Sequence, residues 1–120
     1  MKKILIVEDE MNLAVLMGLR LDTLGYKVIG AANGAEAVKK AKRERPDLII
    51  LDLMIPVFDG YEVCRILKED EATKRIPVVV VTAKTSIADM DEAFRCGVDD
   101  YITKPYEWQK LYDKIKKYLV

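Results

Sequence analysis

Short apolar runs alternate with stretches of helical periodicity along the whole chain, and this alternation restricts the fold more than any other feature. The apolar runs are rich in Ile, Leu and Val and lie at residues 4–7, 26–30, 47–51, 76–81 and 98–103. Helical periodicity occupies residues 11–24, 34–44, 61–69, 85–96 and 108–119. Strands that alternate with helices in this way pair in parallel through right-handed crossovers. The alternation therefore predicts an α/β fold.

The predicted strands show no regular exchange of apolar and polar residues, which is typical of strands covered on both faces. We therefore expect a three-layer αβα sandwich around a five-stranded parallel sheet. The chain of 120 residues fits one domain over residues 1–120, with no separate output domain. In the first helix we expect four residues to face the core, namely Leu13, Leu16, Met17 and Leu24. The last helix carries one apolar stripe, made by Trp108, Leu111, Tyr112, Ile115 and Leu119.

Composition excludes several kinds of function. The chain has no His, so Ser-His-Asp catalysis, Cys-His catalysis and His-ligated zinc are excluded. Its 20 basic and 20 acidic residues give a formal net charge of +0, so we expect no direct contact with nucleic acid. Cys64 and Cys96 form no CxxC motif and are interpreted as small core residues rather than a disulfide. No apolar run reaches the length of a membrane span or a signal peptide, so a cytoplasmic location is expected.

Polar side chains follow four of the five predicted strands. Glu8 and Asp9 follow the first, Asp52 follows the third, Thr82 ends the fourth and Lys104 follows the fifth. Each residue alone has an ordinary explanation, such as a helix cap, a loop residue, a strand end or a solvated charge. The carboxyl ends of parallel strands nevertheless meet at one edge of a doubly wound sheet, where such folds bind ligands. Together these residues predict a functional site at that edge.

The chemistry of this set favours phosphoryl transfer with a divalent cation. Three carboxylates placed close together repel one another, and a hard cation with oxygen ligands relieves that repulsion. We expect Mg²⁺, with Mn²⁺ able to substitute. A carboxylate is a competent nucleophile toward phosphorus, and Asp52 stands alone on its strand, so it is the predicted nucleophile. Lys104 and Thr82 would supply a positive charge and a hydroxyl donor to the phosphoryl oxygens.

Five short motifs at these strand ends carry a resemblance to a known family. They are Val7-Glu8-Asp9-Glu10, Leu51-Asp52-Leu53-Met54-Ile55-Pro56, Asp59-Gly60, Val81-Thr82-Ala83 and Thr103-Lys104-Pro105. In order and spacing, the chain resembles the receiver domain of two-component response regulators over essentially all of its length, with the single-domain fold of the chemotaxis type. The resemblance implies a flavodoxin-like sheet with strand order 2-1-3-4-5. It also implies a phosphoacceptor in a His-Asp phosphorelay rather than an enzyme acting on other substrates.

The resemblance assigns roles around the phosphoacceptor Asp52. Asp9 and Asp52 would ligate Mg²⁺ directly, Glu8 would act largely through water, and the backbone carbonyl of Met54 would complete the protein ligands. Lys104 would pair with the phosphoryl group. The bond from Lys104 to Pro105 is expected to be cis, an isomer found in only about 5–6% of X-Pro bonds.

Further roles concern switching and dephosphorylation. Thr82 and Tyr101 match the switch pair, in which the hydroxyl moves toward the phosphate and the aromatic ring turns inward; without the motif Tyr101 would be interpreted as a half-exposed strand aromatic. Met54 and Lys84 occupy the two positions through which the family modulates dephosphorylation. Neither carries an amide or acid that could position water, so we expect a long-lived phosphoaspartate.

Partner surfaces are predicted from the helices. A second apolar face of the first helix, made by Met11, Ala14, Val15 and Gly18, predicts a partner surface. The resemblance implies that this helix docks a sensor histidine kinase or a histidine phosphotransfer protein. The alternative is that these are scattered small apolar residues. The lysines of the last helix are interpreted as a solvated face. We expect a monomer or a weak dimer that depends on phosphorylation, while the downstream target stays open.

Three other functions remain as alternatives. A Mg²⁺-dependent phosphatase or phosphotransferase of the haloacid dehalogenase type would want a second Asp at position 54, where Met54 stands. A nucleotide- or flavin-binding protein would want a Gly-rich or Ser/Thr-rich loop where Glu8-Asp9-Glu10 stands. A pseudo-receiver would bind partners without being phosphorylated, and the intact acidic set speaks against it.

Overall fold

The computed structural model describes all 120 residues and has five strands that alternate with five helices. The strands are β1 (Lys3–Val7), β2 (Lys27–Ala31), β3 (Leu48–Leu51), β4 (Val78–Thr82) and β5 (Asp100–Thr103). The helices are α1 (Met11–Thr23), α2 (Gly34–Glu44), α3 (Gly60–Glu69), α4 (Ile87–Arg95) and α5 (Trp108–Tyr118). All strand pairs are parallel in the order β2-β1-β3-β4-β5, so the predicted fold class and strand order are confirmed.

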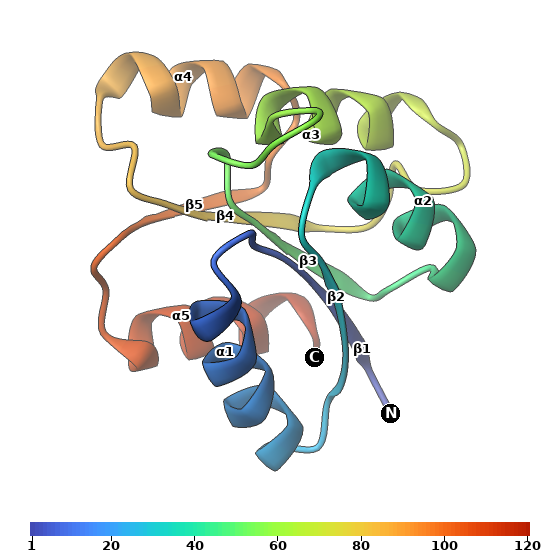
Figure 1. Ribbon diagram of the computed structural model, residues 1–120, viewed down its shortest axis with the longest axis vertical. Coiled ribbons are helices and arrows are strands. Elements are labelled where there is room, and N and C mark those ends of the chain that lie inside the picture. Colours follow the sequence, from blue (N-terminus) through green and yellow to red (C-terminus); the bar gives the residue numbers. More distant parts are fainter.

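Helices cover both faces of the sheet (Figure 1). One apolar layer joins the sheet to α2, α3 and α4 and includes Ala37, Leu67 and Ala93. The other joins the sheet to α1 and α5 and includes Leu21 and Ile115. The runs of β3 and β4 contribute side chains to both layers, because successive residues of a strand point to opposite faces. This explains why those runs lack polar alternation.

Side-chain caps and a glycine stabilise the ends of several helices. Asn33 caps α2 by accepting a hydrogen bond from the Glu36 N–H at 2.8 Å, and Asp59 caps α3 in the same way. Gly97 follows α4 with φ of +104°, a conformation that favours glycine. Both cysteines are free, as expected. The strand predictions began two residues early at β4 and β5, where Pro77 and the turn after α4 precede the sheet.

The predicted core face of α1 is largely wrong. Leu13, Leu16 and Leu24 are exposed, whereas Leu21 is fully buried. Met17 packs against the core one turn before Leu21. The first helix is apolar nearly all round, so periodicity alone could not select the stripe that meets the sheet. None of the five helices combines the length and the apolar character needed to cross a membrane.

Candidate functional site

Glu8, Asp52 and Lys104 meet at the carboxyl edge of the sheet, where the loops after β1, β3 and β5 converge. The Lys104 Nζ lies 2.6 Å from Oε1 of Glu8 and 3.0 Å from Oδ2 of Asp52. Both carboxylates are buried, with residue exposures of 8% for Glu8 and 7% for Asp52. Buried charges are stable only when they are paired, and one ammonium here pairs with two carboxylates. The cluster therefore keeps one formal negative charge in excess.

Burial and pairing shift the acid–base behaviour of this cluster in definite directions. Burial raises the pKa of Glu8 above its ordinary value, although the hydrogen bond from Lys104 opposes the rise. Burial would by itself lower the pKa of Lys104, but its hydrogen bonds to Glu8 and Asp52 outweigh that effect and raise the pKa. Lys104 therefore remains an ammonium at neutral pH. It can hold negative oxygens at this edge of the sheet.

The loop between β3 and α3 orients the Asp52 carboxylate. The Met54 N–H donates to Asp52 Oδ1 at 2.9 Å, while Oδ2 faces Lys104. The loop is held at its far end, where the Gly60 N–H donates to the Leu53 carbonyl at 3.0 Å. Asp52 is therefore fixed through both carboxylate oxygens. Met54 itself is exposed beside it.

Thr82 and Tyr101 are connected through Lys84. Thr82 is fully buried, and its Oγ accepts a long hydrogen bond of 3.5 Å from the Lys84 N–H. The Tyr101 hydroxyl donates to the Lys84 carbonyl at 2.8 Å, and its ring packs against Phe94. Tyr101 is half-buried in this arrangement. The loop after β4 therefore links the two residues that the resemblance names as a switch.

Asp9 does not join the other two carboxylates in a ready-made metal site. It is exposed, and no three acidic, His or Cys side chains of the chain lie together as a set that could hold a metal ion. In this conformation Lys104 lies between Glu8 and Asp52. The donors available at this edge are carboxylate oxygens and backbone carbonyls, which are the ligands Mg²⁺ prefers, so their chemistry fits this ion. The peptide bond from Lys104 to Pro105 is cis, the isomer expected there.

The predicted docking face of α1 is divided in the structure. Met11 and Val15 are exposed, but Ala14 and Gly18 are only partly so, and an added Cβ at Gly18 would lie 3.6 Å from Val28. These two residues lie on the side of the helix nearer the sheet. Of the four predicted docking residues, only Met11 and Val15 are therefore fully open to a partner.

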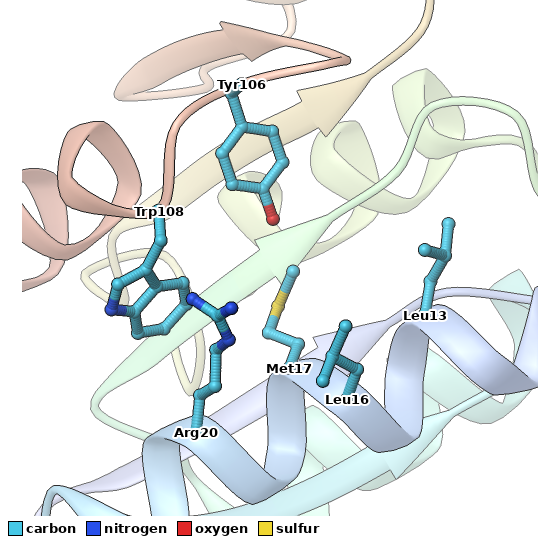
Figure 2. Close-up of a pocket in the computed structure, with 6 residues that line it drawn as sticks. All are labelled: Leu13, Leu16, Met17, Arg20, Tyr106 and Trp108. Atoms are coloured by element: carbon cyan, nitrogen blue, oxygen red, sulfur yellow. The ribbon is translucent and has the colours of Figure 1, made fainter.

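A different apolar groove lies on the other flank of α1, and sequence reasoning missed it. Leu13, Leu16, Met17 and Arg20 form one wall, and Tyr106 and Trp108 form the other (Figure 2). The Arg20 guanidinium lies 5.1 Å from the centroid of the Trp108 ring. The groove has a volume of about 200 Å³. The i, i+3, i+4 spacing of Leu13, Leu16 and Met17 indicated this face of the helix, but these three residues were interpreted as core.

Comparison with known proteins adds independent findings. A family model for the response regulator receiver domain matches residues 4–116. The chain is 42% identical over 118 residues to the alkaline phosphatase synthesis transcriptional regulatory protein of Bacillus subtilis, covering 98% of this chain and 48% of that protein. It is 39% identical over 119 residues to a DNA-binding dual master transcriptional regulator of Synechocystis, with 99% and 49% covered. The chain thus spans about half the length of the curated relatives it matches.

Solved structures agree in fold. The receiver domain of a sensor histidine kinase from Pseudomonas aeruginosa, with a magnesium ion coordinated in the active site cleft, superposes with a TM-score of 0.90 at 32% identity, covering 98% of this chain and 96% of that one. A response regulator of Thermotoga maritima in complex with Mg²⁺-BeF gives a TM-score of 0.88 at 34% identity, with 99% and 100% covered.

Proposed function

The chain belongs to the response regulator receiver domain family, and on that basis we propose that Asp52 is the residue through which it accepts a phosphoryl group. Receiver domains are signalling modules of two-component systems that sensor histidine kinases phosphorylate. The observation that carries the assignment to Asp52 is its position. It is a buried carboxylate, held through both oxygens, in contact with a partly buried ammonium at the carboxyl edge of the sheet. No other Asp of the chain is buried.

The contacts of Asp52 suggest how the transfer proceeds. An Asp52 oxygen attacks phosphorus and forms a new P–O bond, while the bond from phosphorus to the donor breaks and the donor keeps the electron pair. Lys104 offsets the negative charge of the phosphoryl oxygens, and the Met54 N–H keeps the carboxylate oriented. Thr82 is the hydroxyl donor on the neighbouring strand. These contacts let the domain promote its own phosphorylation from a donor that supplies an activated phosphoryl group.

Asp9, Asp52, the Met54 carbonyl and, through water, Glu8 would hold the Mg²⁺ that this chemistry requires. When bound, the ion offsets the repulsion between an anionic donor and an anionic nucleophile. Both magnesium-containing relatives are receivers of the same fold. Mn²⁺ offers the same preference for oxygen ligands and is expected to substitute.

Mass spectrometry tests the central assignment. The protein is incubated with Mg²⁺ and acetyl phosphate, and the expected product carries one added phosphoryl group. Asp52→Ala is expected to abolish the adduct, whereas Asp59→Ala, which removes an exposed helix cap in the same loop, is expected to retain it. Wild-type protein without an adduct, or Asp52→Ala with an undiminished one, contradicts the proposal.

The groove between α1 and the start of α5 is the better docking surface for the phosphohistidine donor. It is apolar and lies on the α1–α5 side of the sheet (Figure 2). Leu16→Glu is expected to slow transfer from the cognate kinase about tenfold, the loss typical of an important apolar contact in an interface. It should leave the reaction with acetyl phosphate unchanged. Leu19→Glu is the matched control, since Leu19 is exposed on the same helix but does not line the groove. Equal loss with both donors would reject a docking role.

Met54 and Lys84 bear on the lifetime of the phosphoryl group. Met54 is exposed next to Asp52 and has no group that could orient water. The Lys84 ammonium lies 3.7 Å from Asp89, on α4. The phosphoaspartate is therefore expected to be long-lived, and Met54→Asn is expected to shorten its decay time.

A further inference from the structure

Asp89, on the first turn of α4, is the centre of a hydrogen-bond network that the proposed function does not use. Its Oδ1 accepts from the Tyr61 hydroxyl at 2.9 Å, and its Oδ2 accepts from the Ser86 hydroxyl at 2.7 Å. The Lys84 ammonium lies 3.7 Å from Oδ1. Ser86 and Asp89 alone would make an ordinary capping arrangement, since the Asp89 N–H also donates to Ser86 Oγ. The hydrogen bond from Tyr61 is not part of this cap, because Tyr61 belongs to α3 and the bond joins two helices.

The Tyr61 hydroxyl is suited to hold a neighbouring helix. Tyr61 is buried at 8% exposure, with its ring beside the Lys84 ammonium. Burial first, and then the hydrogen bond to Asp89, raise the pKa of Tyr61, so the hydroxyl stays protonated. Hydrogen bonds from Ser86 and Tyr61 lower the pKa of Asp89, so the acceptor stays charged. A neutral donor facing a charged acceptor makes a stronger hydrogen bond than two neutral groups.

The same network reaches the switch residues through one segment of backbone. Residues 83–86 connect β4 to α4, and Asp89 holds this segment through Ser86 and Lys84. Lys84 in turn donates its N–H to Thr82 Oγ and accepts the Tyr101 hydroxyl at its carbonyl. α3 and α4 lie on the same face of the sheet (Figure 1). Tyr61 on α3 is therefore joined to Thr82 and Tyr101 by a continuous chain of contacts.

We propose that Tyr61 and Asp89 form a latch that positions the loop of residues 83–86, and through it the Thr82 hydroxyl, for phosphoryl transfer to Asp52. Both are positioning residues, because they act through Lys84 and not on the reacting atoms. The inference rests on the proposed function, since it concerns the rate of that reaction. Holding the loop in one arrangement before the donor arrives removes an ordering step from the transfer.

The test compares initial rates of phosphorylation by acetyl phosphate in Tyr61→Phe, Asp89→Ala and the double variant. Loss of one hydrogen bond is expected to slow the reaction about three- to tenfold. The double variant is expected to be no slower than Asp89→Ala, because the two residues act through one contact. Tyr118→Phe and Asp91→Ala are matched controls and should react at the wild-type rate. Tyr118 contacts Asp99 and Asp100, and Asp91 pairs only with Arg95 on its own helix.

Two further measurements separate positioning from a loss of structure. The Mg²⁺ concentration for half-maximal rate should be unchanged in Tyr61→Phe, because the latch touches none of the predicted metal ligands. Amide hydrogen exchange should accelerate at residues 83–86 and stay unchanged in β1 and β3. Rates of Tyr61→Phe and Asp89→Ala equal to those of the controls, or additive losses in the double variant, overturn the latch. If the wild-type protein accepts no phosphoryl group, the proposed function itself is contradicted, and the latch proposal falls with it.

Discussion

Gly34 allows the loop that carries Asp52 to pass directly against the start of α2. Its N–H donates to the Pro56 carbonyl at 3.0 Å. A Cβ at position 34 would lie 2.6 Å from Cβ of Phe58 and would collide with the Phe58 carbonyl oxygen. Both contacts are with the backbone or inner side chain of the loop, so they cannot be relieved by turning a flexible side chain. The absence of one methyl group at Gly34 therefore helps to set the path of residues 52–59.

Gly34→Ala is expected to lower the free energy of unfolding by about 1–3 kcal/mol, because the added methyl forces the loop away. It should also slow phosphorylation by acetyl phosphate, since the displaced loop carries Asp52. Gly18→Ala is the control with the opposite sign. Gly18 lies within α1, and the nearest atom to an added Cβ would be Cγ1 of Val28 at 3.6 Å. A Gly→Ala change in a helix stabilises by about 0.5–1 kcal/mol. Denaturant unfolding measures both, and a neutral Gly34→Ala would contradict the close contact.

Individual site residues differed in how far the sequence could identify them. The positions of Asp52, Thr82 and Lys104 were predictable, because each lies at the end of a recognisable strand and parallel strands end at one edge. Which carboxylates pair with Lys104 was not predictable. Lys104 contacts Glu8 and Asp52, and Asp9 is left exposed. That choice depends on side-chain geometry that strand order does not contain.

At the scale of elements, β5 and α5 are joined through Asp100. Its Oδ1 lies 3.2 Å from the Lys114 ammonium, and its Oδ2 accepts from the Tyr118 hydroxyl at 3.1 Å. Burial would by itself raise the pKa of Asp100, but the hydrogen bonds from Lys114 and Tyr118 outweigh it and lower the pKa. Part of the lysine-rich face of α5 is therefore committed to this contact and is not merely solvated. The sequence prediction of a solvated face is corrected for Lys114.

Asp100→Asn is expected to cost about 1–2 kcal/mol of unfolding free energy at neutral pH. Because the pKa of Asp100 is lowered by folding, its contribution is present above the unfolded-state pKa and is lost as pH falls through the folded-state pKa. The difference between variant and wild type should therefore shrink in acid. Asp113→Asn, an exposed acid on α5, should change stability by less than about 0.5 kcal/mol. A difference that persists at the acid limit would contradict the ionic contribution.

The elements themselves were largely predictable, and α1 shows where prediction stopped. Apolar runs of four to six residues between helical stretches predicted a five-stranded parallel sheet, whereas the order of its strands came from the resemblance to receiver domains. α1 offered several apolar stripes, and the selection of Leu21 over Leu16 depends on how the helix rotates against β1 and β2. The groove with Trp108 depends on the same rotation, combined with the approach of α5.

At the scale of the whole molecule, a net charge of +0 conceals a local excess of acid at one edge of the sheet. Glu8, Asp9 and Asp52 lie there with Lys104 as the ammonium that two of them share. A cation that binds only the folded chain stabilises the whole domain by mass action. The local imbalance should therefore be visible in global unfolding.

Saturating Mg²⁺ is expected to raise the unfolding free energy by about 2.7 kcal/mol at one hundred times its dissociation constant, and a chelator should reverse the gain. Asp9→Asn should remove most of this increment in unfolding free energy. This readout requires no phosphorylation assay. Glu36→Gln is the matched control, because Glu36 lines the same hollow as Asp9 but pairs with Lys40 and is not a predicted ligand. Denaturant unfolding with and without Mg²⁺ measures this increment in the wild type and in both variants. An increment that survives in Asp9→Asn but is lost in Glu36→Gln would contradict a Mg²⁺ site at Asp9 and would indicate that the cation binds nearer to Glu36 and β2.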